Sequence, residues 1–562
     1  MKIAVEGCSH GELDNIYASI AKAEEAGGFK TDLLLLCGDF QGIRNVGDLE
    51  CIAVPPKYRS MGSFHRYYSG EKIAPVLTLV VGGNHEASNY MWELAHGGWL
   101  APNIYFLGEA GAVDVNGVII AGASGIYKSH DYTSGRHEQV PYSPSDIRSV
   151  YHTRIFDIWR LKLLANSRES ASAGPSSRPD IVMSHDWPNT IEQHGDVHGL
   201  IKRKPFFKDE INTSTLGSPP LLELLKTLRP SYWFSAHLHV KFAALFKHGG
   251  QGTEVGPQGR EGGAQAGPSN GGEASNPEAI DIDLDDSGEE DVDEEPKGAN
   301  AAATDPTFQG ASETRFLALS KCLPGHKFLQ FFDMPSRQAE EVAGGSESVG
   351  GSSSKPQLCF VPRWLAILRA TNHFLCLQKK QTPLPSVDDA LLLKRIDEEE
   401  DWVRRELMAQ GRNATLAVEP IQHFVRTAPS TSDPQGSMPG PPPWFTNPQT
   451  EALCHWLQME NKINAPPPMP PPHMMPPGFA SQPGFDSPGG RQPQPLPGLS
   501  GAAVALHSSD ERDAKRHKME ARGGGGGNEG PEQAENAGGD GGEPLRLDDE
   551  DEAGARWKEG TG

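Results

Sequence analysis

The feature that most constrains this chain is a set of short apolar runs, each followed at once by polar residues of the types that bind metals. The clearest run covers residues 74–81, and its length and β-branched content are typical of a buried strand. The sequence Gly-Gly-Asn-His-Glu follows directly at residues 82–86. Its two glycines allow a tight turn and a close approach of the backbone to a ligand. The turn therefore presents an amide oxygen, an imidazole and a carboxylate at the end of a strand.

Similar clusters recur elsewhere in residues 1–245, namely Cys8-Ser9-His10, Gly38-Asp39, Ser184-His185-Asp186 and Ala236-His237-Leu238-His239. Each cluster taken alone has an ordinary structural explanation. Cys8 would suit a small buried apolar position, Asp39 could cap a helix, and His185 could be a hydrogen-bonded core histidine. Their joint occurrence in one segment favours a shared metal site instead.

Residues 1–245 read as strands that alternate with helices. Strands are expected at 3–5, 33–37, 76–81, 117–120, 181–183 and 232–235, and helices at 15–26 and 88–94. This alternation predicts an α/β fold, in which ligands gather at the carboxyl ends of the strands. The polar clusters are therefore expected to meet at one place.

Composition divides the chain into regions. We expect a catalytic domain at 1–248, a disordered acidic insertion at 249–311, further sandwich strands with a C-terminal domain at 312–426, and a disordered Pro/Gly-rich tail at 427–562. Strand-like runs at 314–319 and 328–332 indicate that order resumes after the insertion. An amphipathic helix is predicted from the spacing of Leu392, Ile396, Val403 and Leu407.

The formal net charge of −23 is unusual for a partner of nucleic acid, so its location matters. Residues 1–245 hold 23 Lys and Arg against 26 Asp and Glu, a net charge of −3, so most of the negative charge lies outside the expected catalytic domain. The 7 cysteines form no CxxC pair, which suits a reducing, intracellular compartment. We expect no signal peptide and no membrane partner, and the basic residues 515–518 are a weak nuclear-localisation candidate.

The residue types in the clusters indicate phosphoester chemistry. Two divalent metals about 3.5–4 Å apart stabilise an in-line displacement at phosphorus. Such a pair needs a bridging carboxylate, and Asp39 fits that role. Imidazoles and an amide oxygen are neutral ligands, which hold a metal without cancelling its charge.

The order and spacing of the clusters resemble the calcineurin-like metallophosphoesterase superfamily, whose first motif is usually Asp-x-His. This chain has Cys8 in place of that aspartate, and this departure is typical of the RNA lariat debranching enzymes. Longer stretches carry the same resemblance, at residues 7–14, 56–59, 67–70, 82–90, 97–104, 124–128 and 184–188. The likeness runs through residues 1–245 and resumes at 314–332.

The resemblance implies hydrolysis of the 2′-5′ phosphodiester at the branch point of excised intron lariats, on a sandwich of two packed β-sheets flanked by helices. It implies one metal held by Cys8, His10, Asp39 and His239, and another held by Asp39, Asn84, His185 and His237. His85 would protonate the departing 2′-oxygen, and general acids of this kind contribute about 10²–10⁴-fold. A thiolate beside imidazoles favours Fe(II) or Zn over Mg or Ca, and Mn is a third candidate.

The segment that begins at Ser124 and ends at Arg154 resembles the family's lariat-recognition loop. Rings and cationic or titratable side chains interleave in it: Tyr127, Lys128, His130, Tyr132, Arg136, His137, Tyr142, Arg148, Tyr151, His152 and Arg154. Unstacked bases stack on such rings, and phosphates pair with such cations. An ordinary polar surface loop is the alternative. Splicing or intron-turnover proteins are candidate partners through the disordered segments.

Two other functions stay in consideration. The first is a superfamily enzyme that acts on phosphoproteins or nucleotides, and Cys8 and segment 124–154 speak against it. The second is a non-catalytic scaffold, which would require a missing ligand or a missing acid. No such residue is missing from the clusters.

Overall fold

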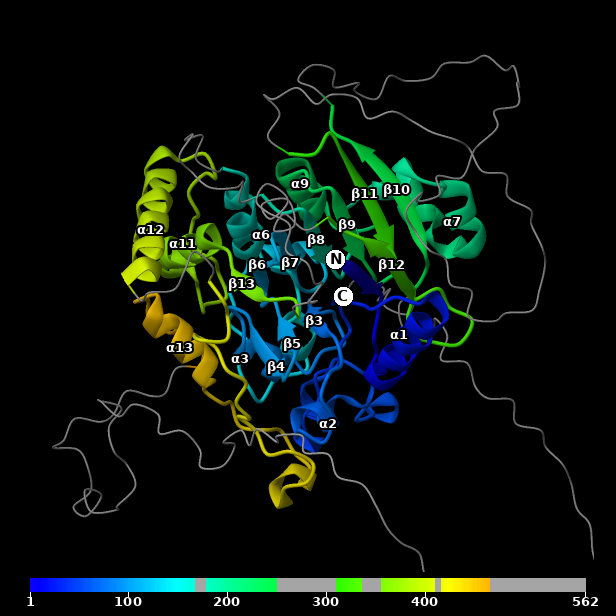
Figure 1. Cartoon of the computed structure of the whole chain (residues 1–562), viewed down its shortest axis with the longest axis horizontal. Helices are drawn as coiled ribbons and strands as arrows, with labels where there is room; N and C mark the ends of the chain where they lie inside the picture. Colours follow the sequence, from blue (N-terminus) through cyan, green and yellow to red (C-terminus); the bar gives the residue numbers. More distant parts are fainter. Residues whose placement is uncertain (167–177, 250–309, 336–354, 410–415, 465–562) are drawn as a thin grey trace, which may run out of the picture. The chain divides into compact units, whose positions relative to one another are not determined.

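A computed structural model describes residues 1–166, 178–249, 310–335, 355–409 and 416–464 (Figure 1). The first of its two sheets has 6 strands in the order β12-β1-β2-β3-β5-β4. Strands β1, β2, β3 and β5 run parallel, while β12 and β4 are antiparallel edge strands. Their bounds are β1 Lys2–Glu6, β2 Leu33–Leu36, β3 Leu77–Val80, β4 Gly98–Ala101, β5 Ile104–Phe106 and β12 Leu329–Asp333.

The second sheet has 7 strands in the order β10-β11-β9-β8-β7-β6-β13. The central strands β11, β9, β8 and β7 are parallel, and β10, β6 and β13 pair antiparallel to their neighbours. Their bounds are β6 Ala110–Val115, β7 Val118–Ala123, β8 Ile181–Ser184, β9 Tyr232–Ser235, β10 Phe242–Lys247, β11 Glu313–Ala318 and β13 Leu358–Phe360. The neighbours β10 and β11 stand on either side of the acidic insertion in the sequence.

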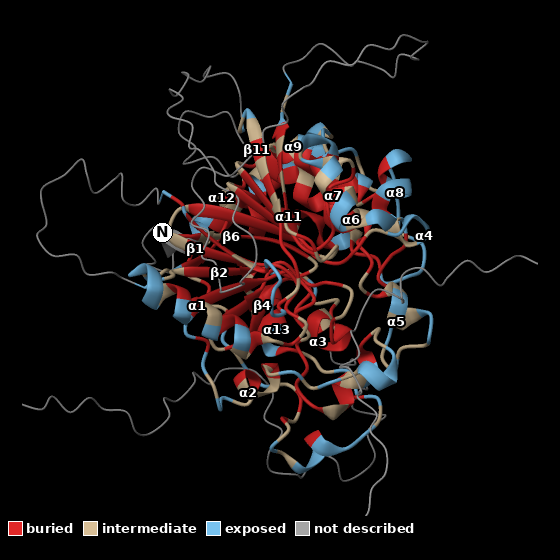
Figure 2. Cartoon of the chain, turned by 90° about the vertical axis from the view of Figure 1, so that its right-hand side faces the viewer, coloured by how far each residue is buried: buried red, intermediate tan, exposed pale blue. Residues whose placement is uncertain are grey.

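Helices cover the outer side of each sheet, and Figure 2 shows the strands as buried and the outward sides of several helices as exposed. The first sheet packs on α1 (Leu13–Gly27), α2 (Phe64–Tyr68) and α3 (Ser88–Glu93). The second packs on α6 (Ile155–Lys162), α9 (Pro219–Leu228), α11 (Pro362–Thr371) and α12 (Ala390–Ala409). The other α-helices are α4 (Ser129–Tyr132), α5 (Asp146–Ser149), α7 (Val197–Arg203), α8 (Lys208–Asn212) and α13 (Pro448–Trp456). Short 3₁₀ turns cover Val46–Cys51, Pro56–Tyr58, Leu163–Ala165, Ile191–His194, Pro205–Phe207, Asn372–Phe374 and Pro434–Ser437.

Strand β2 illustrates why an unbroken apolar run becomes a central strand. Leu33 and Leu35 belong to the core between the two sheets, whereas Leu34 and Leu36 belong to the core under α1 and α2. All four side chains are buried. A strand that is covered on both faces has no polar face, so its sequence shows no alternation.

The predicted α/β sandwich of two packed sheets flanked by helices is confirmed. Each strand expected in residues 1–245 is present, and the run at 117–120 forms the longer β7. The predicted amphipathic helix is α12, in which Leu392, Ile396 and Val403 are buried. Residues 250–309 of the expected acidic insertion lie outside the described residues. No helix in the described part of the chain combines the length and the apolar character needed to cross a membrane.

The prediction that a disordered tail begins at residue 427 is wrong for residues 427–464. Helix α13 lies in this segment, where Leu453 and Leu457 are fully buried. The side chain of Gln449 accepts a hydrogen bond from the Trp99 N–H at 2.8 Å and donates one to the Trp99 carbonyl at 2.9 Å. Composition misled the prediction because prolines and glycines set the local turns here, while distant side chains supply the burial. Residues 465–562 lie outside the described residues.

Candidate metal centre

The predicted ligands all follow strand ends. Cys8 and His10 come after β1, Asp39 after β2, Asn84 after β3, His185 after β8, and His237 and His239 after β9. Strands β1, β2 and β3 are parallel neighbours in one sheet, and β8 and β9 are parallel neighbours in the other. The ligand residues of each sheet therefore gather at one edge, and the packing of the sheets brings the two edges together.

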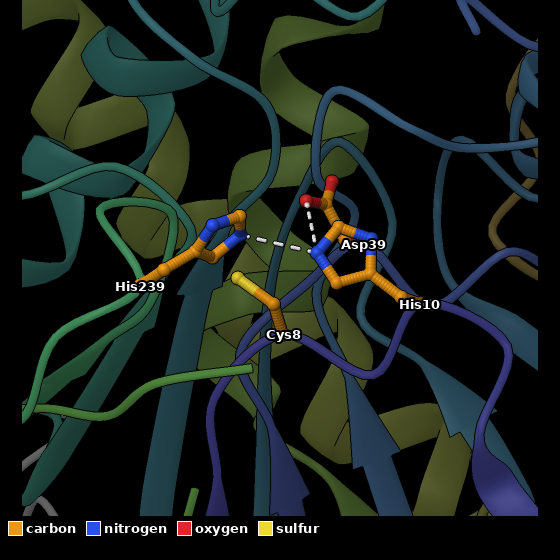
Figure 3. Close-up of side chains that lie close together, drawn as sticks. All are labelled: Cys8, His10, Asp39 and His239. Atoms are coloured by element: carbon orange, nitrogen blue, oxygen red, sulfur yellow. Dashed lines mark hydrogen bonds and ion pairs between the residues drawn. The ribbon is translucent and has the colours of Figure 1, made fainter. Parts of the chain in front are cut away.

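Four of these residues form the first ligand group. Each of Cys8, His10, Asp39 and His239 offers one ligand atom, and these atoms lie within 4.8 Å of one another (Figure 3). His10 Nε2 is 3.1 Å from His239 Nε2 and 3.7 Å from Asp39 Oδ2. A thiol, two imidazoles and a carboxylate directed at one point form a suitable donor set for a transition metal.

A second ligand group lies on the other side of Asp39. His185 Nε2 is 3.3 Å from Asp39 Oδ1 and 3.1 Å from Asn84 Oδ1. The ring of His237 lies 5.0 Å from that of His185, measured between ring centroids. Asp39 thus directs one oxygen at each group, which is the arrangement that a bridging carboxylate requires. The fold brings all of the predicted ligands together.

Burial keeps most of the imidazoles neutral. It lowers the pKa of His10 to about 4, that of His237 to about 3 and that of His239 to about 2, so that each ring presents a lone pair at neutral pH. Burial opposes the ionisation of Asp39, but His185 and the other nearby histidines hold the pKa of Asp39 well below its usual value. The ring of His185 faces the Cys37 carbonyl through Nδ1 at 2.9 Å, which directs Nε2 at Asp39 and Asn84. Imidazole ligands of metals are commonly oriented in this way.

Cys8 behaves differently from the histidines. Burial, together with the charges of Asp39 and Glu6, raises the pKa of the Cys8 thiol well above its usual value. The backbone N–H of His237 donates a hydrogen bond to Cys8 Sγ at 3.1 Å. Because metals bind the thiolate, metal binding at Cys8 must release a proton.

Several ligands adopt a backbone conformation that non-glycine residues rarely take. The φ angle is 43° at His10, 47° at Asp39, 62° at His237 and 50° at His239. Such conformations cost about 1–3 kcal/mol each and persist where the surrounding structure enforces them. Four of the seven predicted ligands share this conformation, which indicates that the fold imposes the geometry of these strand ends.

Two glycines make room for the ligands themselves. A Cβ on Gly83 would lie 2.2 Å from Asp39 Oδ1, and a Cβ on Gly38 would lie 2.3 Å from His185 Nδ1. Gly38 also has a φ of 114°. The sequence predicted that glycine lets the backbone approach a ligand molecule; here the close neighbours are side chains of the site.

Glu86 has a role that the sequence analysis did not assign. Its carboxylate accepts hydrogen bonds from the N–H groups of Phe40 at 2.7 Å, Gln41 at 2.8 Å and Gly83 at 2.8 Å. It therefore fastens the turn after β2, which carries Asp39, to the turn after β3. The signal available in the sequence was a carboxylate placed directly after His85.

His85 lies beside the first ligand group. Its ring centroid is 5.6 Å from that of His10, and its backbone N–H donates to Asp39 Oδ1 at 2.9 Å. The His85 side chain is half-buried, and Nδ1 has no hydrogen-bond partner among the described residues. The backbone hydrogen bond to Asp39 therefore holds His85 beside the first ligand group.

Segment 124–154 approaches the second ligand group at its N-terminal end. The N–H of Tyr127 donates to Asp186 Oδ2 at 3.1 Å, and Asp186 follows His185 directly. The rings of Tyr127 and Tyr132 pack edge to face, 5.6 Å apart between centroids. Lys128, which lies between these two tyrosines in the sequence, is exposed.

The sequence predicted RNA recognition by this segment as a whole, and the structure buries several of its cationic or titratable side chains, His152 among them. Arg136 forms ion pairs at 2.6 Å with Glu109 and with Asp157. His152 is buried and hydrogen-bonded to Asp131, and Arg154 is buried and paired with Glu138. Because a buried charge needs a partner, these side chains brace the segment internally. Lys128, His130 and Arg148 are the exposed cationic or titratable residues of the segment.

Comparison with known proteins assigns both halves of the described chain. Residues 1–241 match the family model of calcineurin-like phosphoesterases, and residues 311–462 match that of the C-terminal domain of lariat debranching enzymes. The chain is 41% identical to the lariat debranching enzyme of Danio rerio, over 82% of this chain and 66% of that protein. It is 42% identical to that of Drosophila melanogaster, over 82% and 78% of the two chains, and 38% identical to that of Arabidopsis thaliana, over 83% and 88%.

Proposed function

Because the chain belongs to the lariat debranching enzymes, within the calcineurin-like phosphoesterases, we propose that it hydrolyses the 2′-5′ phosphodiester at the branch point of intron lariat RNA. The reaction converts lariats into linear RNA for turnover after splicing. The observation that carries this proposal is the convergence of two ligand groups on Asp39, with His85 beside them and Cys8 in the first group.

The donor set fits two divalent metals. Cys8, His10, Asp39 and His239 would hold one, and Asp39, Asn84, His185 and His237 the other. The thiol favours Fe(II) or Zn, with Mn as the third candidate. When bound, such metals supply Lewis acidity toward the scissile phosphate.

The remaining steps fall to side chains of the protein. His85 lies beside the first ligand group but is not one of its four members, so we assign it the donation of a proton to the departing 2′-oxygen. Glu86 keeps this arrangement rigid by joining the turns that carry Asp39 and His85. Tyr127, Tyr132 and Lys128 offer rings and a charge for the bases and phosphates around the branch.

The site of action is proposed to be the nucleus. The support is the basic cluster at residues 515–518, which lies outside the described residues, together with the origin of intron lariats in splicing. Splicing or intron-turnover proteins are the proposed protein partners. Localisation of a fluorescent fusion with residues 515–518 intact or replaced by alanine tests the first point, because an unchanged distribution contradicts the role of this cluster.

One assay separates the proposed function from its alternatives. Purified, metal-loaded protein is given a synthetic 2′-5′ branched RNA, a linear 3′-5′ RNA of matched composition and an aryl phosphate. We expect efficient cleavage of the branched RNA alone, and loss of that cleavage in Asp39→Asn. Preference for the aryl phosphate would indicate a different phosphoesterase, and inactivity on all three substrates would indicate a scaffold.

A further inference from the structure

A cleft of about 360 Å³ opens next to the first ligand group. One wall comes from Arg203 at the end of α7, and another from Val240 and Lys241, which directly follow His239. The rest comes from the β11–β12 loop through Ser320, Gly325, His326 and Lys327. None of these lining residues carries a carboxylate.

The β11–β12 loop also reaches the metal centre. The N–H of Cys8 donates to the Ser320 carbonyl at 3.3 Å, and the N–H of Cys322 donates to the Cys8 carbonyl at 3.1 Å. Lys321 is therefore paired with Cys8 as a parallel β-bridge. The Lys321 side chain is half-buried and makes no ion pair with any described residue. Lys321 therefore places a cation next to the ligand Cys8.

We propose that this basic cleft, which is lined by Arg203, Lys241 and Lys327 and adjoined by Lys321, binds the sugar–phosphate backbone of one RNA strand that leaves the branch point. The proposal rests on the proposed function, because the metal centre fixes where the branch lies. Lys321 is nearest the ligands and takes the phosphate next to the scissile bond. The other cations take the phosphates that follow along the strand.

The positions of the two cationic surfaces support this assignment. Segment 124–154 meets the site beside His185, through Tyr127 and Asp186. The basic cleft meets it beside Cys8 and His239. A branched RNA has three strands that meet at one nucleotide, so binding surfaces on both sides of the metal centre match its shape.

The surroundings of Arg203 suit a single strand in particular. Phe206 is 55% exposed and lies three residues beyond Arg203. The Nζ of Lys204 is 5.5 Å from the centroid of the Phe206 ring. Exposed rings among cations are typical of proteins that stack unpaired bases while pairing with the backbone.

Two measurements test the cleft. In the first, metal-free protein binds a fluorescently labelled linear single-stranded RNA over a range of salt concentrations. In the second, metal-loaded protein cleaves branched RNA with either long arms or single-nucleotide arms. The variants are Arg203→Gln/Lys327→Gln and Lys321→Gln, and the matched control is Lys22→Gln/Lys394→Gln, whose exposed lysines lie on α1 and α12.

For Arg203→Gln/Lys327→Gln we expect weaker RNA binding and a salt slope reduced by about 1.4, since each single-strand phosphate contact contributes about 0.7. The KM for the long-armed substrate should rise about tenfold or more, which corresponds to the loss of a few charge-assisted contacts. Cleavage of the short-armed substrate should be unchanged. Lys321→Gln should keep its metals and lose activity on both substrates. The control should match the parent throughout.

Three results would overturn the cleft proposal: an unchanged salt slope, an equal loss in the control, or competition by poly-glutamate as strong as by unlabelled RNA. A parent protein that binds RNA through the cleft but cleaves neither branched substrate would instead contradict the proposed function. The RNA-binding measurement therefore tests the cleft proposal whether or not the protein cleaves branched RNA.

Discussion

The two oxygens of Asp39 face different histidines, and much of the site serves to keep this buried carboxylate ionised and fixed. The histidines around it hold its pKa below the usual value, while Gly83 leaves room for it. The carboxylate of Glu86 ties together the two turns on which this arrangement depends. At the residue scale, the protein therefore fixes both the charge and the position of Asp39 before any metal binds.

Replacement of His85 separates proton donation from metal binding. In His85→Ala we expect both metals to stay bound, since no described ligand is removed, and turnover to fall about 10²–10⁴-fold through loss of the general acid. Metal analysis and the cleavage rate of branched RNA should be recorded on the same sample. His198→Ala, at an exposed histidine of α7, is the control. Parent-like turnover, or loss of the metals, would remove His85 from the role of acid.

Replacement of Cys8 tests whether its thiol is a ligand. We expect Cys8→Asp to keep a working site whose preference moves toward harder ions such as Mn, because a carboxylate is a harder ligand than a thiolate. Cys8→Ser should bind every metal more weakly, because a neutral hydroxyl replaces an anionic ligand. Each metal is titrated into the metal-free parent and both variants. Binding curves that overlay for all three proteins would strike Cys8 from the ligand set.

The raised pKa of Cys8 also predicts how metal binding depends on pH. Burial raises this pKa, so the thiol is protonated at neutral pH in the metal-free protein and must lose its proton when a metal binds. Affinity for Zn should therefore increase with pH, and Cys8→Ser should release one proton fewer per metal bound. Calorimetric titration in buffers of different ionisation enthalpy counts these protons. Equal proton release by parent and variant would contradict thiolate ligation.

At the scale of elements, the sequence predicted those features that depend on local pattern. Strand ends could be located because apolar runs such as 33–36 are buried on both faces, and the ligand types follow them directly. Helix α13 could not be predicted, because its burial depends on partners far away in the sequence, such as Trp99. The same holds for Lys321, which the pairing of distant segments brings to Cys8.

The burial of α13 predicts that it is part of the folded unit. Leu453 is fully buried, so Leu453→Ala should lower the free energy of unfolding by about 2–5 kcal/mol. Leu391→Ala, at a leucine of α12 that is 80% exposed, should change it little. Truncation after residue 426 should likewise destabilise the protein, whereas truncation after 464 keeps every described contact. Thermal and urea unfolding of the four variants measure this, and a stable, active chain ending at 426 would contradict the role of α13.

At the scale of the whole molecule, the fold places two sets of strand ends face to face. One sheet supplies Cys8, His10, Asp39 and Asn84, and the other supplies His185, His237 and His239, so neither sheet holds a complete metal site. The residue types of the site could be predicted from sequence because they adjoin strands. The buried ion pairs of Arg136 with Glu109 and of Arg154 with Glu138 could not be predicted, because these partners meet only when segment 124–154 is folded.

Titration of metal into the metal-free protein, under exclusion of oxygen, examines the Asp39-centred site as a unit. Bound Fe(II) or Zn and the rate of branched-RNA cleavage are followed together as equivalents of metal are added. Because the two ligand groups share Asp39, we expect activity to rise until two equivalents of metal are bound per chain. The Asp39→Asn variant should not reach this plateau. Full activity at one equivalent, or activity that does not depend on metal, would contradict a two-metal centre bridged by Asp39.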